Sequence, residues 1–292
     1  MPAAASLAPA SLLLAATLWG LIWYPYRLLE QAGLSGSVSS LLTYGLGILP
    51  LLFLSRRARA GLDGQWPWLL AVAVTAGWTN LSYVLAVIQG EVVRVMLLFY
   101  LAPLWTVLFA RLILGERAGR AGLAVIALAL GGAFVMLWRG EGFPLPANEA
   151  EWLGLSSGMG FALSNVLTLR TRDIPITTRS LWVFLGVMSM AGLFTLFEAE
   201  VPARIAAVTP LHWWLMAGIA LALLAATFAV QYGLALVPAN RAVVILLSEL
   251  VVAALSSRWL AGEVMEAREW LGGAMIVAAT LFSIRLHREK SP

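Results

Sequence analysis

Ten apolar stretches, each about as long as a membrane-spanning helix, are the feature that most limits what this chain can fold into. A transmembrane helix needs about 20 predominantly apolar residues. We expect spans over residues 8–26, 36–54, 67–88, 93–114, 121–138, 152–169, 180–197, 211–232, 240–260 and 269–286. The first stretch lacks a basic n-region and carries Trp19 and Trp23, so we expect it to remain as a helix instead of being cleaved as a signal peptide. The sequence therefore predicts an all-α membrane protein with ten transmembrane helices and no separate soluble domain.

The composition points the same way and excludes several classes of protein. Hydrophobic residues make up 61% of the 292 residues and charged residues 12%, whereas soluble domains have roughly 45–50% and about 25%. A soluble enzyme, a nucleic-acid-binding protein and a disordered chain are therefore excluded, and membrane lipid is the expected surroundings. The chain has no Cys and two His, His212 and His287, so we expect no metal site and no cofactor.

The Lys and Arg residues predict the orientation in the membrane. On the side shared by the two termini lie 13 of them: Arg56, Arg57, Arg59, Arg111, Arg117, Arg120, Arg170, Arg172, Arg179, Arg241, Arg285, Arg288 and Lys290. The opposite side has 6: Arg27, Arg94, Arg139, Arg204, Arg258 and Arg268. Because cytoplasmic loops carry the excess of basic residues, we expect both termini in the cytoplasm.

The two halves of the chain repeat each other. Residues 111–116 read Arg-Leu-Ile-Leu-Gly-Glu and residues 258–263 read Arg-Trp-Leu-Ala-Gly-Glu, and each segment ends an apolar stretch. We therefore expect two repeats of five helices, residues 1–145 and residues 146–292. An odd number of spans inverts one repeat relative to the other. Inverted repeats are a transporter architecture with the substrate site near mid-membrane between the halves. Glu116 and Glu263, at corresponding helix ends, are expected to cap the N-termini of neighbouring helices.

Several short motifs give the chain a family resemblance. They are Leu18-Trp19-Gly20-Leu21-Ile22-Trp23 in the first span, Leu114-Gly115-Glu116 at the end of the fourth, Ser248-Glu249-Leu250 in the ninth and Gly262-Glu263 after it. In their order and spacing they resemble the EamA-type, ten-helix branch of the drug/metabolite transporter superfamily, and within it the aromatic amino-acid exporters. The resemblance implies efflux of aromatic amino acids, and of flat cationic drugs, across a bacterial inner membrane. One departure is Leu250, where the family usually has Pro, so a kink at this point of the ninth span is not implied.

Glu249 is the only carboxylate in the middle of a predicted span. A charged side chain inside a bilayer is expensive, so it has either a functional or a structural reason to be there. One hypothesis is that Glu249 couples transport to protons or binds a substrate amine. The other is that it holds the ninth helix to a neighbour by a hydrogen bond.

Arg94 and Arg241 also allow two interpretations. Both begin predicted spans, where they would either clamp an anionic substrate or extend to the membrane interface. None of the basic residues lies in mid-span, which argues against sugar phosphates as substrates.

Aromatic and polar residues within the spans are the candidate substrate-binding set. Flat apolar faces combined with a few hydroxyls and amides suit an aromatic or amphipathic solute. The candidates are Trp19, Tyr44, Trp78, Asn80, Tyr83, Tyr100, Asn165 and Tyr232. The alternative for each is ordinary packing between helices.

These features favour a secondary transporter over the other functions we weighed. A passive facilitator or a multidrug exporter of amphipathic cations on the same fold stays open. A membrane-embedded enzyme would need a catalytic constellation that the spans do not show, because Asp63 and Asp173 lie in predicted loops and Lys290 in the tail. The expected partner is a small-molecule substrate, and we expect a monomer.

Overall fold

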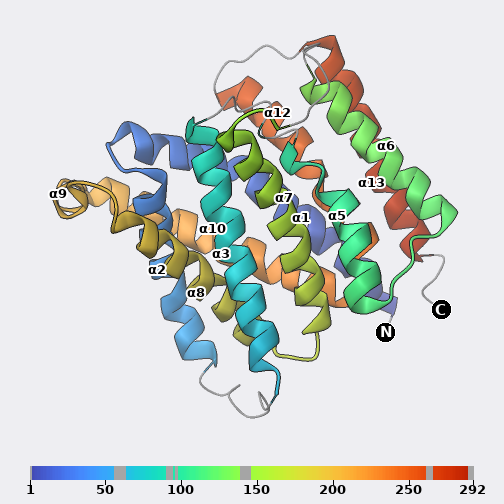
Figure 1. Ribbon diagram of the computed structural model, residues 1–292, viewed down its shortest axis with the longest axis horizontal. Coiled ribbons are helices and arrows are strands. Elements are labelled where there is room, and N and C mark those ends of the chain that lie inside the picture. Colours follow the sequence, from blue (N-terminus) through green and yellow to red (C-terminus); the bar gives the residue numbers. More distant parts are fainter. Residues whose placement is uncertain are drawn as a thin grey trace.

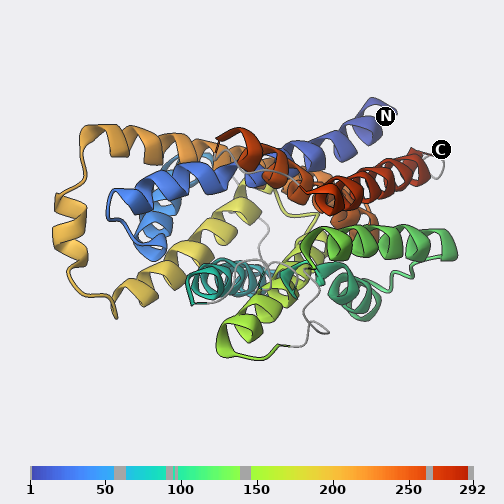
Figure 2. The ribbon, with the colours of Figure 1, turned by 90° about the horizontal axis from the view of Figure 1, so that it is seen from above.

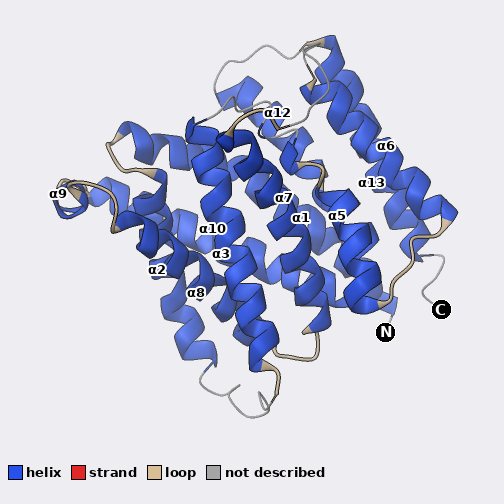
Figure 3. Ribbon diagram, viewed as in Figure 1, coloured by secondary structure: helices blue, strands red, loops and turns tan. Residues whose placement is uncertain are grey.

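The structure is a computed structural model, and it describes residues 2–55, 64–89, 95, 98–138, 146–260 and 266–288. Within these ranges every regular element is a helix, as Figures 1 and 3 show. The helices are α1 (Pro2–Gln31), α2 (Gly36–Ser55), α3 (Trp66–Gln89), α5 (Ala102–Phe109), the π-helix η2 (Ala110–Leu114), α6 (Arg120–Leu137), α7 (Glu149–Arg170), α8 (Ile176–Thr195), α9 (Val201–Ala206), α10 (Pro210–Leu236), α11 (Ala239–Leu246), α12 (Ser248–Leu260) and α13 (Ala267–Arg288).

Six of these helical stretches are long and apolar enough to cross a membrane. They are Leu7–Gln31, Gly36–Leu54, Trp66–Ala86, Ile176–Thr195, Pro210–Leu236 and Ala239–Leu260. Three shorter apolar helices, Ala102–Leu114, Arg120–Val135 and Trp270–Phe282, fall on three further predicted spans. The first helix continues through Pro25 to Gln31, past the end we expected at residue 26. The all-helical, multi-pass membrane architecture is therefore confirmed.

The predicted sixth span is α7, which differs from the other long helices because it is buried in the protein. Its face of small residues lets neighbouring backbone approach closely. A Cβ atom on Gly154 would lie 3.0 Å from Val95, and one on Gly158 would collide with the backbone of Phe99. The Gly154 and Gly158 pair thus packs against other parts of the same chain, which small residues at this spacing allow. These small residues make α7 less apolar, so α7 is not among the six helical stretches that are apolar enough to cross a membrane.

Two helices are interrupted near the middle of the bundle. The chain makes a turn at Tyr100 and Leu101 before α5 begins, and Pro103 near the start of α5 cannot donate a backbone hydrogen bond. The other interruption is at Leu247, between α11 and α12, where Leu250 N–H bonds to the carbonyl of Leu247 only three residues back. This second interruption occurs without a proline, so Leu250 in place of Pro does not give a continuous helix.

The helices pack in pairs that lie far apart in the sequence. α1 packs on α10, α3 on α7, α2 on α8 and α6 on α13. Figure 2 shows α1 and α10 on one side of the molecule, and α3 and α7 on the other. At one end of the α2–α8 pair, the Glu198 carboxylate accepts hydrogen bonds from Ser35, at 2.7 Å, and Ser37. α1 begins and α13 ends at the same end of the molecule (Figure 1).

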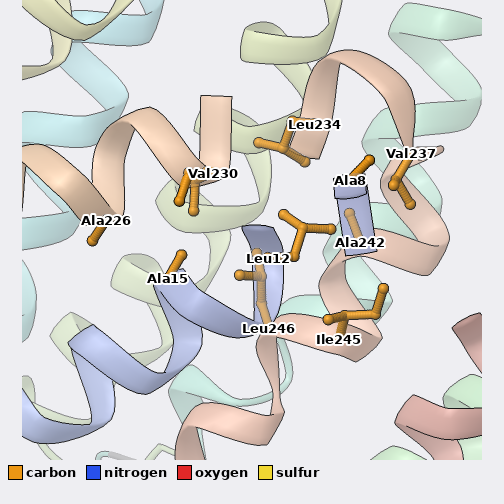
Figure 4. Packing of buried hydrophobic residues seen from close by; sticks show 11 residues of the cluster. Ala8, Leu12, Ala15, Ala226, Val230, Leu234, Val237, Ala242, Ile245 and Leu246 are labelled. Atoms are coloured by element: carbon orange, nitrogen blue, oxygen red, sulfur yellow. The ribbon is translucent and has the colours of Figure 1, made fainter. Parts of the chain in front are cut away.

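Small side chains bring α1, α10 and α11 together. Ala8, Leu12 and Ala15 of α1 meet Ala226 and Val230 of α10 and Ala242, Ile245 and Leu246 of α11, as Figure 4 shows. Gly233 of α10 lies directly on Leu12. This close packing places one face of α1, with Trp19, toward the centre of the molecule.

Candidate functional site

Aromatic rings from four parts of the chain meet at the centre. The Phe99 ring, just before the turn at Tyr100, lies 5.3 Å from Tyr83 of α3, 5.2 Å from Tyr100 and 5.5 Å from Phe161 of α7, measured between ring centroids. Trp19 of α1 meets Phe161 edge-on at 6.0 Å. These are ordinary separations for favourable aromatic pairs. The five rings form one continuous group, called the aromatic centre below.

A narrow space lies beside the aromatic centre, where both interrupted helices contribute to its wall. Its lining is Phe99, Tyr100, Ala102, Phe161, Val243, Leu246, Leu247 and Glu249. The space is small enough that it has room for about one water molecule. An organic solute can bind here only after the walls move apart. The interruptions in the two helices supply places at which such a movement can occur.

Glu249 is the charged side chain in this lining. It lies in the first turn of α12, immediately after the interruption at Leu247, and is half-buried. Within the described residues no side chain or backbone group donates a hydrogen bond to its carboxylate. Structural Glu residues inside a membrane normally have such a partner. The arrangement therefore leaves the carboxylate free to receive a proton, a water molecule or a substrate ammonium group.

Contacts between α1 and α12 hold this region in place. Ser256 of α12 donates to the carbonyl of Gly20 at 3.2 Å and accepts a hydrogen bond from the indole N–H of Trp23 at 2.9 Å. Trp23, which belongs to the motif of the first span, thus positions α12 and does not join the aromatic centre.

The structure brings together four of the nine candidate residues: Trp19, Tyr83, Tyr100 and Glu249. Phe99 and Phe161 belong to the same group and were missed, because an isolated Phe in an apolar span carries no polar signal. The glycines Gly158 and Gly160 on α7 were a possible signal for Phe161, since they mark the helix that approaches the centre.

The other five candidates are neither among the rings of the aromatic centre nor in the lining of the space beside it. Tyr44 pairs with Phe184 of α8 at 4.8 Å in a separate apolar cluster. Tyr232 packs against the cluster of α1, α10 and α11, which Trp19 and Phe161 also contact. Trp78 is 39% exposed, and Asn80 is half-buried on α3. Asn165 is buried on α7, and its amide nitrogen has no partner among the described groups. The rotation of each helix about its own axis decides which of its side chains face the aromatic centre. The residue types alone do not reveal this rotation.

Glu116 caps a helix, as the sequence predicts. It follows Gly115, whose φ of +70° ends η2, and its carboxylate accepts hydrogen bonds from the backbone N–H groups of Ala239 and Asn240 at the start of α11. The Asn240 side chain adds a long hydrogen bond of 3.4 Å. Partial burial raises the pKa of Glu116 above its ordinary value, against the opposing effect of those N–H groups and of Arg241. Glu263 and Arg94 lie outside the described residues.

Comparison with known proteins identifies relatives for nearly the whole chain. The sequence model of the EamA-like transporter family matches residues 7–138 and again residues 149–285. An uncharacterized transporter of Archaeoglobus fulgidus is 30% identical over 224 residues, which cover 74% of this chain and 76% of the relative. A solved crystal structure superposes with a TM-score of 0.74 at 19% identity, covering 97% of this chain and 98% of the other. At that identity the likeness shows the fold alone.

Proposed function

The chain belongs to the EamA-like transporter family, and from that premise we propose that it is a secondary transporter that exports aromatic and other neutral amino acids by alternating access. Membership of a transporter family indicates movement of a solute across the membrane instead of its chemical conversion. The observation that carries the proposal is the aromatic centre with the Glu249 carboxylate beside it, to which no group in the described part of the chain donates a hydrogen bond.

The proposed architecture is ten spans in two inverted five-helix repeats, residues 1–145 and 146–292. Three observations support it. The family model matches the chain twice, once in each half. When Glu116 is aligned with Glu263, Tyr100 falls on Leu247, so both helix interruptions occupy corresponding positions. In the proposed repeats α1 is equivalent to α7 and α3 to α10, so the packing of α1 on α10 is equivalent to the packing of α7 on α3. In the pairs α2–α8 and α6–α13, each helix packs on its own equivalent in the other repeat.

The substrate class follows from the lining. Aromatic rings offer large apolar faces to an aromatic side chain, and a carboxylate offers an acceptor to its ammonium group. Trp19, Tyr83, Tyr100, Phe99 and Phe161 are the proposed aromatic contacts, and Glu249 is the proposed amine-binding or proton-coupling group. We propose that the remaining candidates contact the substrate only in a conformation in which the helices have moved; they are Tyr44, Trp78, Asn80, Asn165 and Tyr232.

Amphipathic organic cations are a second candidate class. Glu249 is the one charged side chain in the described lining of the central space, and no Lys or Arg accompanies it there to receive a substrate carboxylate. Rings beside a carboxylate attract a cation by π interaction as well as by charge. A lining with a carboxylate and no basic side chain favours a cationic substrate over an anionic one. A zwitterionic amino acid would need a residue outside this lining to bind its carboxylate.

The proposed location is a bacterial inner membrane with both termini in the cytoplasm. The excess of basic residues on one predicted side supports that orientation. α1 begins and α13 ends at the same end of the molecule (Figure 1), which agrees with an even number of spans. A passive facilitator on the same fold would take up the solute down its own concentration gradient, and would need no pH gradient.

Uptake into proteoliposomes tests the proposal. Labelled tryptophan, phenylalanine and methionine, and separately a planar aromatic cation such as ethidium, would be offered with and without a pH gradient. Saturable uptake of the aromatic amino acids supports the first candidate, and uptake of the cation alone supports the second. Uptake that does not respond to the gradient favours the facilitator. Folded protein that moves none of these solutes faster than empty liposomes contradicts both candidates.

A further inference from the structure

Arg179 joins three helices from a position inside the protein. It lies in the first turn of α8 and, among the residues whose burial is described, has the largest fully buried side chain, 1% exposed. One guanidinium nitrogen donates to the carbonyl of Thr168 on α7 at 3.1 Å, and another donates to the carbonyl of Gln231 on α10 at a longer 3.4 Å. A single side chain thus spans the gap between α7 and α10.

Stability alone does not explain this charge. Among the described residues no carboxylate lies within ion-pair distance of Arg179, and its Nε atom has no partner. The Thr168 carbonyl belongs to the last turn of α7, where the helix carries partial negative charge, so the contact is favourable. The Asp173 carboxylate, which lies beyond ion-pair distance, also favours the charged guanidinium. Even with these partners, a buried guanidinium costs more to desolvate than a neutral side chain of the same size. This desolvation cost indicates that Arg179 has a function other than packing.

In the described part of the structure, the contact between α7 and α10 is closer than the contact at the corresponding place in the other half. In the proposed repeats α7 corresponds to α1 and α10 corresponds to α3. α7 packs on α10, whereas the described parts of α1 and α3 make at most slight contact. The first turn of α2, which corresponds to α8, contains Ser37 and Ser39 and no basic residue. The Ser39 hydroxyl is buried without a partner and is too short to bridge two helices.

We propose that Arg179 is the residue that holds the cytoplasmic side of the transport path closed, by tying α7 to α10. Inverted repeats exchange their conformations during alternating access, so one side closes when the corresponding helices on the other side separate. The solute enters from the cytoplasm only after the guanidinium leaves the Thr168 or the Gln231 carbonyl. This inference rests on the proposed transport function and on its repeat architecture.

The natural absence of cysteine makes a direct accessibility test possible. Val243→Cys places a thiol of similar size in the lining of the central space. A membrane-impermeant maleimide would be applied to this variant in inside-out and in right-side-out vesicles. With Arg179→Gln added, labelling from the cytoplasmic side should become roughly tenfold faster, as loss of a charged hydrogen bond would allow. Labelling from the outer side should not rise.

Arg120→Gln is the matched control, since Arg120 is exposed at the start of α6 on the same predicted side. It removes the same charge and should leave both labelling rates unchanged. If Arg179→Gln does not give a monodisperse protein, Arg179→Lys keeps the charge but cannot reach both carbonyls, and the same faster labelling is expected. Folded Arg179 variants that label like the parent overturn the proposal. Because labelling needs no substrate, this result is independent of whether the solutes named above are transported.

Discussion

The backbone carbonyl oxygen of Glu249 lies so close to Gly20 that a Cβ atom on Gly20 would approach it to 2.8 Å. The same Cβ would collide with the Val252 side chain. The glycine of the first-span motif is therefore a packing requirement of α12. It also explains how Trp19 and Glu249, distant in the sequence, come to lie on the same central region.

Gly20→Ala should destabilise the protein by about 1–3 kcal/mol, because the added methyl group forces α1 away from α12. The apparent melting temperature of the purified protein in detergent measures this. Gly218→Ala is the control, since Gly218 is in α10 and a Cβ there meets nothing within 4 Å. We expect the control to be neutral or slightly stabilising, by up to about 1 kcal/mol. Equal melting temperatures for Gly20→Ala and the parent would refute the close packing.

Glu249→Gln should leave the protein folded but remove the response of transport to a pH gradient. The amide of Gln is similar in shape to the carboxyl group of Glu, but it takes up no proton at the pH values of the assay. Only the acid–base role of the side chain is therefore lost. Initial uptake rates at several internal and external pH values provide the measurement. Glu30→Gln, at an exposed position near the end of α1, is the matched control and should behave like the parent. Full retention of gradient-dependent transport by Glu249→Gln would assign Glu249 a structural role.

Phe161→Ala should weaken substrate binding more than it slows the transport cycle. Phe161 contacts both Trp19 and Phe99, and each aromatic pair contributes about 0.5–1.5 kcal/mol. We expect KM to rise about tenfold, with a smaller change in maximal rate. Phe282→Ala removes a ring of the same size that is 49% exposed on α13 and should leave KM unchanged. A parent-like KM for Phe161→Ala would exclude the aromatic centre as the binding site.

Glu116→Gln should flatten the dependence of stability on pH. Burial raises the pKa of Glu116 in the folded protein, so the folded state binds a proton more readily than the unfolded state does. The stability linked to that proton is present below the ordinary carboxyl pKa of 4.5 and is lost as the pH rises through the higher folded value. The melting temperature of the parent should therefore fall over this window. The melting temperature of Glu116→Gln, whose amide oxygen still accepts from Ala239, should fall less.

Glu149→Gln controls for removal of a carboxylate at an exposed site near the start of α7. Its pH profile should follow that of the parent. If the parent and Glu116→Gln show the same slope, the cap does not titrate in this window.

The central site could be predicted from the sequence only in part. Glu249, Trp19, Tyr83 and Tyr100 carry a signal, because charge or an amphipathic ring inside an apolar stretch is unusual. Tyr44 carries the same signal, yet it packs on Phe184 in another cluster. Which face of a helix points to the centre depends on the helices beside it, and one amphipathic ring in an apolar stretch does not specify that face.

By itself the sequence determined that this chain is a bundle of membrane helices, because apolar stretches of this length and number have no other way to satisfy their backbone hydrogen bonds in lipid. It also determined the Glu116 cap, since a carboxylate directly after a Gly-terminated helix is available to a nearby N-terminus. Only the tertiary structure decided that the ninth span is interrupted at Leu247 without a proline, between α11 and α12, that Phe99 and Phe161 join the aromatic centre, and that Arg179 lies inside the protein. Each of these depends on contacts between helices distant in the sequence, and such contacts leave no local pattern.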